Sequence, residues 1–202
     1  METVSNILFA LSSGLLFPVI VCLLALFIYA LVHCVTSFVD YNRFVAEQRR
    51  LNPLIDSVTA DNISSLLPRL QGDGGSMFTH SVRLLASNSQ SAPARERLLA
   101  DLEVDIDKKL GRSRLLVKIG PMIGLMGTLI PMGPALTGLA SGDIASMAYN
   151  MEVAFATTVI GILIAAIGML TLQVAKRCYA RLLNNLEFIN QMISGNEGNE
   201  KA

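Results

Sequence analysis

The chain has 202 residues, of which 52% are hydrophobic and only 16% are charged. This composition is too apolar for an ordinary water-soluble domain of this length and favours a membrane protein. Sixteen basic and sixteen acidic residues balance each other, and nothing in the charge indicates nucleic acid as a partner. The three cysteines and two histidines show no disulfide or metal-ligand spacing, so we expect no metal site and no cofactor.

Three long stretches lack Asp, Glu, Lys and Arg: residues 3–39, 119–142 and 153–175. Each is long enough to cross a bilayer, because about 20 apolar residues at about 1.5 Å per residue span the hydrocarbon core. We predict one crossing within 1–39, with its best core at 16–37, a second at 118–142 and a third at 153–175. Pro18 is expected to kink the first helix or to mark its entry into the membrane.

The basic residues predict the orientation. Twelve of the sixteen lie between Arg43 and Lys118, and the other four follow the third apolar run. Under the positive-inside rule, regions 40–117 and 176–202 are cytoplasmic, whereas the N-terminus and the 143–152 loop are outside. No basic residue precedes the first apolar run, which favours a retained anchor over a cleaved signal. We therefore expect a multi-pass protein of the inner, cytoplasmic membrane.

The region after the first crossing is predicted to contain several short helices. A helix leaves the membrane and is interrupted at Pro53, a short helix follows from an N-cap at Asp61, and glycines mark a loop at 71–77. Another short helix is expected at 77–87. No strand pattern, phosphate-binding loop or catalytic constellation is visible, and we expect no enzymatic activity.

The second and third crossings are predicted to belong to much longer helices. Helical periodicity begins near Pro93 and enters the second crossing with no stop signal except Gly111. It also continues well beyond Lys176, after the third crossing, and ends in a polar tail from Ser194 that we expect to be disordered. The expected fold is an all-α membrane protein with three transmembrane helices, two of which extend into the cytoplasm as an antiparallel pair.

Small residues recur on one face of each of these crossings. Because lipid gives membrane helices little hydrophobic reason to associate, such faces mark close helix contacts. They either pack the two crossings together, with threonine hydroxyls bonded to their own helix, or line a shared space in an oligomer; the spacing does not separate these alternatives. For the second alternative, the predicted contacts with a partner helix are Gly120, Gly124, Gly127, Thr157, Gly161 and Ala165.

Neither the second nor the third apolar run contains a titratable side chain. A chain that translocates ions by itself normally has one within the membrane. If protons pass, another subunit must supply the carboxylate. Glu152, at the outer edge of the third crossing, either attracts cations at the mouth of a path or is an ordinary interface charge near a helix N-terminus.

Two segments resemble the MotA/TolQ/ExbB proton channel family. The stretch PMIGLMGT, residues 121–128, is similar to the family's P-L-L-G-L-L-G-T signature. The stretch VAFATTVIGI, residues 153–162, is similar to its A-x-x-A-T-A-x-G-L segment, which places Thr158 and Gly161 on the threonine and glycine of that motif. The two blocks have the family's order and separation, and the resemblance covers about 111–189. Here Pro131 and Pro134 follow the first block and are expected to bend the helix.

The resemblance implies a function and an assembly. Three crossings with an outside N-terminus are similar to the ExbB/TolQ branch, which implies a homo-oligomer, a pentameric ring walled by crossings two and three. The ring would surround two copies of an ExbD/TolR-like single-crossing subunit whose membrane aspartate carries the proton. The implied ion-pathway residues are Thr128 and Thr158, with Glu152 near the outer mouth, and proton flow would drive motion of a partner in the cell envelope.

Two other function classes remain open at this point. The chain could be a non-conducting membrane scaffold that assembles other membrane proteins, or a small transporter subunit with a substrate site between crossings. A neighbouring reading frame that encodes one membrane crossing with a buried aspartate would favour the ion-channel subunit over both.

Overall fold

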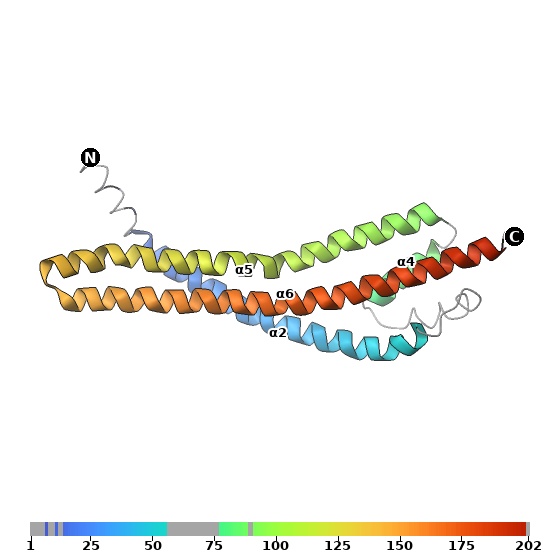
Figure 1. Cartoon of the computed structure of the whole chain (residues 1–202), viewed down its shortest axis with the longest axis horizontal. Coiled ribbons are helices and arrows are strands. Elements are labelled where there is room, and N and C mark those ends of the chain that lie inside the picture. Colours follow the sequence, from blue (N-terminus) through green and yellow to red (C-terminus); the bar gives the residue numbers. More distant parts are fainter. Residues whose placement is uncertain (1–6, 8–10, 12–13, 56–76, 89–90, 201–202) are drawn as a thin grey trace. The chain divides into compact units, whose positions relative to one another are not determined.

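The computed structural model describes residues 7, 11, 14–55, 77–88 and 91–200, and within these residues it contains four helices (Figure 1). The helices are α2 (Leu16–Ile55), α4 (Met77–Ser87), α5 (Ala92–Ser141) and α6 (Ile144–Glu200). Among the described residues, α2, α5 and α6 are the helices that are long and apolar enough to cross a membrane. The all-helical class and the three apolar helices are therefore confirmed.

The long helices agree with the periodicity of the sequence. α5 begins close to Pro93 and continues through Gly111 into the apolar run, and α6 continues far beyond Lys176. α4 has the bounds that were predicted for it. Pro18 lies in the first turn of α2, where a missing N–H is tolerated, and α2 passes Pro53 before its end at Ile55. The helix predicted from Asp61 and all but the last residue of the predicted loop lie outside the described residues.

The connection between α5 and α6 is shorter than the predicted 143–152 loop. The Asp143 N–H donates to the Gly138 carbonyl at 2.8 Å and the Gly142 N–H to the Leu139 carbonyl at 3.2 Å, with Gly142 at a φ of 79°. This is a Schellman C-cap, for which glycine is the favoured residue. Asp143 also caps the next helix, because the Ser146 N–H donates to its Oδ1 at 3.0 Å. The two overlapping caps reduce the loop to a two-residue turn.

The end of α6 also differs from expectation. The sequence from Ser194 was expected to be disordered because it is polar and rich in glycine, yet the helix continues to Glu200. This segment contains no proline, so nothing in it removes a backbone donor from the helix.

The chain forms two compact units. Unit 1 comprises Met1–Phe38 and Gly111–Gln173, and therefore includes most of the uncharged parts of α2, α5 and α6. All three helices contribute to its core, which contains Leu23, Ala30, Leu116 and Ile164. α2 thus packs against both α5 and α6, with partly buried Ile123 and Ile160 beside the core.

Unit 2 comprises Val39–Leu110 and Val174–Ala202. Its buried side chains are mostly large and aliphatic, spaced three or four residues apart on α5 and α6: Leu102, Ile106, Leu110, Leu182, Leu186 and Ile189. Polar pairs join the helices as well. Arg95 is only 1% exposed and its Nε donates to Asn190 Oδ1 at 2.9 Å, and Asn185 donates to Gln48 at 3.2 Å.

Candidate functional site

In unit 1, α5 and α6 run antiparallel and approach each other through glycines. A β-carbon built on Gly161 would lie 2.8 Å from Gly124 Cα, and one built on Gly127 would lie 2.6 Å from Thr157 Cβ. A β-carbon on Gly120 would lie 2.9 Å from a methyl carbon of Ile164. Real β-carbons do not approach other atoms so closely, so the contact depends on the absence of side chains at these positions.

Five of the six residues predicted to touch a partner helix therefore lie in a contact within the chain. Gly120, Gly124, Gly127, Thr157 and Gly161 are all buried. This arrangement corresponds to the first alternative left open by the sequence, in which the small faces pack crossings two and three together. The α5–α6 pair covers the surfaces of these five residues. Their contact with a partner helix stays a prediction. The sixth residue, Ala165, is half-buried.

The threonine hydroxyls of this region donate to carbonyls of their own helices. Thr128 Oγ1 donates to the Leu125 carbonyl at 2.7 Å, and Thr158 Oγ1 to the Ala154 carbonyl at 3.1 Å. Both side chains are half-buried, whereas Thr157 is buried against Gly127. A hydroxyl that donates to a carbonyl keeps its own lone pairs, so Thr128 and Thr158 can still accept hydrogen bonds.

Thr128 and Thr158 lie on the side of the α5–α6 pair away from α2. Ile123 and Ile160 pack beside the core that contains α2 residues. At about 100° per residue, Thr128 is turned about 140° from Ile123, and Thr158 about 160° from Ile160. The contact between Gly127 and Thr157 places their two neighbours at the same level. We call this surface, formed by Thr128 and Thr158, the threonine edge.

Glu152 lies apart from the threonine edge and is exposed. It is more than two turns inside α6, which begins at Ile144. The dipole effect of a helix terminus is confined to the first turn, so proximity to an N-terminus does not account for Glu152. Its place in an ion pathway stays a prediction.

A polar cluster that was not predicted from the sequence joins all three helices of unit 1. His33 Nε2 of α2 lies 2.8 Å from Ser113 Oγ of α5, and Thr171 of α6 donates to the same oxygen at 3.4 Å. Tyr29 stacks on the His33 ring with centroids 6.0 Å apart. The available signal was an ionisable side chain within an apolar run, which calls for a partner in the membrane. That partner is 80 residues away in sequence.

The three cysteines lie on two helices, Cys22 and Cys34 on α2 and Cys178 on α6. All three are free, with Cys22 and Cys34 exposed and Cys178 half-buried. Burial raises the pKa of the Cys178 thiol, although Arg181 acts in the opposite direction. Burial thus favours the thiol over the thiolate, which is the reactive form.

Residues 74–188 match the sequence profile of the MotA/TolQ/ExbB proton channel family. The match covers more than half of the chain and includes both motifs that carried the resemblance. The chain belongs to this family. The comparison with curated proteins found no match. The match to the family profile includes α4 and the unit 2 part of α5, neither of which contains the two short motifs.

Proposed function

We propose that the chain is the channel-forming subunit of a proton-driven membrane complex. In this complex the threonine edge faces the single membrane helix of a partner that carries a carboxylate. The observation that supports this most strongly is the pairing of two half-buried hydroxyls at one level of a wall without titratable side chains. A family of proton channels requires a group that changes charge, and here another chain must supply it.

The hydroxyls suit a carboxyl group in either protonation state. When the partner's carboxyl is protonated, Thr128 or Thr158 can accept its hydrogen while continuing to donate to its own helix. When the carboxyl is ionised, either threonine can turn its hydrogen from a backbone carbonyl to the carboxylate. Both exchanges keep polar groups paired in an apolar setting, where an unpaired group is costly. This chain thus provides polar contacts, and the partner binds and releases the proton.

The proposed assembly is a pentameric ring of the three-crossing ExbB/TolQ type, around two copies of an ExbD/TolR-like helix with a membrane aspartate. The threonine edge lies on the side of the α5–α6 pair away from α2, which supports a ring with α2 outside and the threonine edge inside. The ring lies in the inner membrane with its N-terminus outside and its C-terminus cytoplasmic. Proton flow through it moves the partner and so performs work in the cell envelope.

The test is proton flux through the chain reconstituted with a single-crossing, ExbD/TolR-like protein that carries a membrane aspartate. Flux into pyranine-filled liposomes is driven by a potassium diffusion potential. Thr128→Val and Thr158→Val keep the side-chain shape and remove the hydroxyl, so each is expected to lower flux by about 3-fold to 20-fold, the equivalent of one interhelical hydrogen bond. Native mass spectrometry of the same sample should give a five-to-two composition.

Thr137→Val is the matched control. The Thr137 hydroxyl also donates to a carbonyl three residues back, at 2.8 Å, but it lies nine residues after Thr128 and therefore on the opposite side of α5. Proton flux through the Thr137→Val variant should equal that of the wild type. Unchanged flux in both threonine-edge variants would remove the proposed role of the hydroxyls.

A further inference from the structure

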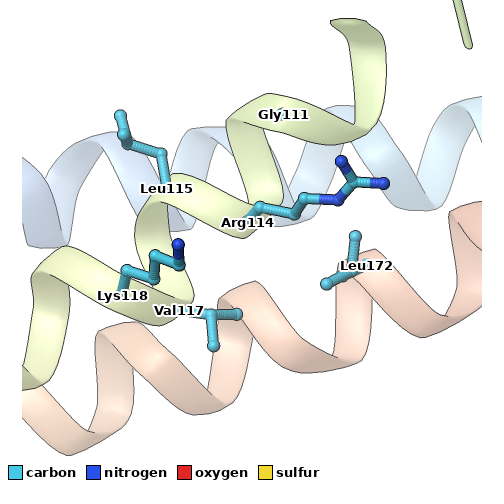
Figure 2. Close-up of a pocket in the computed structure, with 6 residues that line it drawn as sticks. All are labelled: Gly111, Arg114, Leu115, Val117, Lys118 and Leu172. Atoms are coloured by element: carbon cyan, nitrogen blue, oxygen red, sulfur yellow. The ribbon is translucent and has the colours of Figure 1, made fainter. Parts of the chain in front are cut away.

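A cavity of about 330 Å³ opens beside α5 and α6 in unit 1, at the end of the apolar runs (Figure 2). Its lining residues are Gly111, Arg114, Leu115, Val117, Lys118 and Leu172. In Figure 2, Val117 of α5 and Leu172 of α6 lie between the two ribbons, and the nitrogen atoms of Arg114 and Lys118 extend away from the backbone. The cavity thus combines an apolar wall with two cations.

The cavity lies at the boundary of the membrane-spanning region. Lys118 is the last charged residue before the uncharged run of α5, and Leu172 is one turn before Lys176, where the uncharged run of α6 ends. Arg114 and Lys118 are one helical turn apart, about 6 Å along the axis, and both are exposed. Two cations at this spacing on one face can contact a single phosphate group.

We propose that this cavity binds an anionic phospholipid of the leaflet at the basic end of unit 1. The phosphate lies between Arg114 and Lys118, and the first carbons of an acyl chain lie on Val117 and Leu172. Arginine matches phosphate with two parallel hydrogen bonds, and lysine adds a compact charge. Basic pockets between membrane helices bind anionic lipid headgroups because their charges are complementary. The proposal requires only that the chain spans a membrane, and it is independent of proton conduction.

A phospholipid fits these observations better than a free anion. The wall that Val117 and Leu172 form is apolar, so a free phosphate ion would leave it in water, whereas an acyl chain covers it. A zwitterionic lipid carries a cation of its own and gains less from two basic side chains. The cavity should therefore distinguish phosphatidylglycerol from phosphatidylcholine.

Gly111 offers a way to block the cavity without removing charge. Apart from its chain neighbours and the backbone of its own helix, no described atom lies within 4 Å of a β-carbon built on it, so a larger side chain meets no other part of the described chain there. Leucine at this position would extend into the cavity and would favour the helix over glycine. Gly111→Leu therefore tests whether the lipid needs the cavity or only the surrounding positive charge.

The experiment is native mass spectrometry of the purified full chain, titrated in detergent with phosphatidylglycerol or phosphatidylcholine. The wild type is expected to bind phosphatidylglycerol preferentially. Arg114→Gln with Lys118→Gln should weaken that binding by about 25-fold, about fivefold for each basic residue removed. Gly111→Leu should weaken it to a similar extent. The matched control, Lys176→Gln with Arg177→Gln, removes two exposed cations that do not line the cavity and should retain wild-type binding.

Three outcomes would overturn the proposal. Equal weakening in the control pair and the cavity pair would show attraction by diffuse charge. Displacement of phosphatidylglycerol by millimolar inorganic phosphate would identify a free-anion site. Loss of the oligomer in the cavity variants, with unchanged lipid binding, would show that a neighbouring copy of the chain occupies the cavity.

Discussion

Units 1 and 2 use opposite means to hold segments of the same three helices. In unit 1, α5 and α6 meet through glycines whose missing side chains let the backbones approach, and the described polar cluster that joins its helices consists of His33, Ser113 and Thr171. In unit 2, the buried positions of α5 and α6 carry leucine and isoleucine, and a buried arginine is bonded to an asparagine. This is the difference that lipid around unit 1 and water around unit 2 would favour.

Water rewards the burial of large apolar side chains, and unit 2 follows that rule. Lipid does not, since a leucine is as well accommodated by acyl chains as by protein, and close backbone approach is then the main source of attraction. The contrast supports the placement of unit 1 in the membrane. It also explains why the glycines serve the intrachain contact.

The largest expected effect comes from placing a large side chain in the glycine contact of unit 1. Gly161→Leu places a side chain where even a β-carbon would lie 2.8 Å from Gly124 Cα, so α5 and α6 must separate and folded protein should be lost from the membrane. Gly111→Leu, in the same unit but facing open space, should accumulate normally. Membrane-fraction yield and thermal stability in detergent measure both. Normal yield of Gly161→Leu would contradict the packing.

The next effect tests the aliphatic core of unit 2. Leu186 is fully buried, so Leu186→Ala should cost about 2–5 kcal/mol of unfolding free energy. Denaturant-induced loss of protease protection in the 174–200 segment measures it. A cost below about 1 kcal/mol, as for an exposed residue, would show that unit 2 is not held by burial of aliphatic side chains.

A smaller effect tests the buried polar pair of unit 2. Asn190→Ala removes the acceptor of Arg95 Nε and leaves a buried guanidinium with one hydrogen bond fewer, at a cost of about 1–3 kcal/mol. Asn184→Ala changes the same residue type at an exposed position and should stay within about 0.5 kcal/mol. Equal stability of the two variants in the same unfolding assay would contradict the role of the pair.

The smallest expected effect is in the polar cluster of unit 1. Ser113→Ala removes the oxygen that both His33 and Thr171 contact, and hydrogen bonds between membrane helices average about 0.6 kcal/mol. A melting-temperature decrease of a few degrees in detergent is expected. Thr36→Ala, which loses only bonds to its own helix, should change less. If Ser113→Ala aggregated or failed to fold, the cluster would hold α2 far more strongly than hydrogen bonds between membrane helices ordinarily do.

The sequence predicted those parts of the fold that depend on one helix at a time. Uncharged length indicated α2, α5 and α6, and unbroken periodicity around Gly111 and Lys176 predicted the long helices. The Gly142–Asp143 turn was missed because each residue serves as a cap in a different way, and the two caps overlap. Their overlap depends on three-dimensional geometry that residue spacing does not show.

Contacts between helices were less predictable from the sequence. A glycine stripe indicates close approach but not the helix that approaches, so the faces of Gly124 and Gly161 suited a partner as well as each other. His33 and Ser113 meet only through the packing of α2 on α5, and periodicity within either helix does not show it. By contrast, the identification of Thr128 and Thr158 came from motifs, and the structure adds the side of the α5–α6 pair on which they lie.

The most direct test of the central claim is the environment of the threonine edge in the assembled complex. Spin labels are attached at Thr158→Cys and, for comparison, at Ile28→Cys, an exposed position on α2, with the three native cysteines replaced by alanine. The account predicts that membrane-dissolved oxygen relaxes the label at position 28 strongly and the label at position 158 weakly, because position 158 faces the interior of the ring. Equally strong relaxation at both positions would place the threonine edge in lipid and contradict the account.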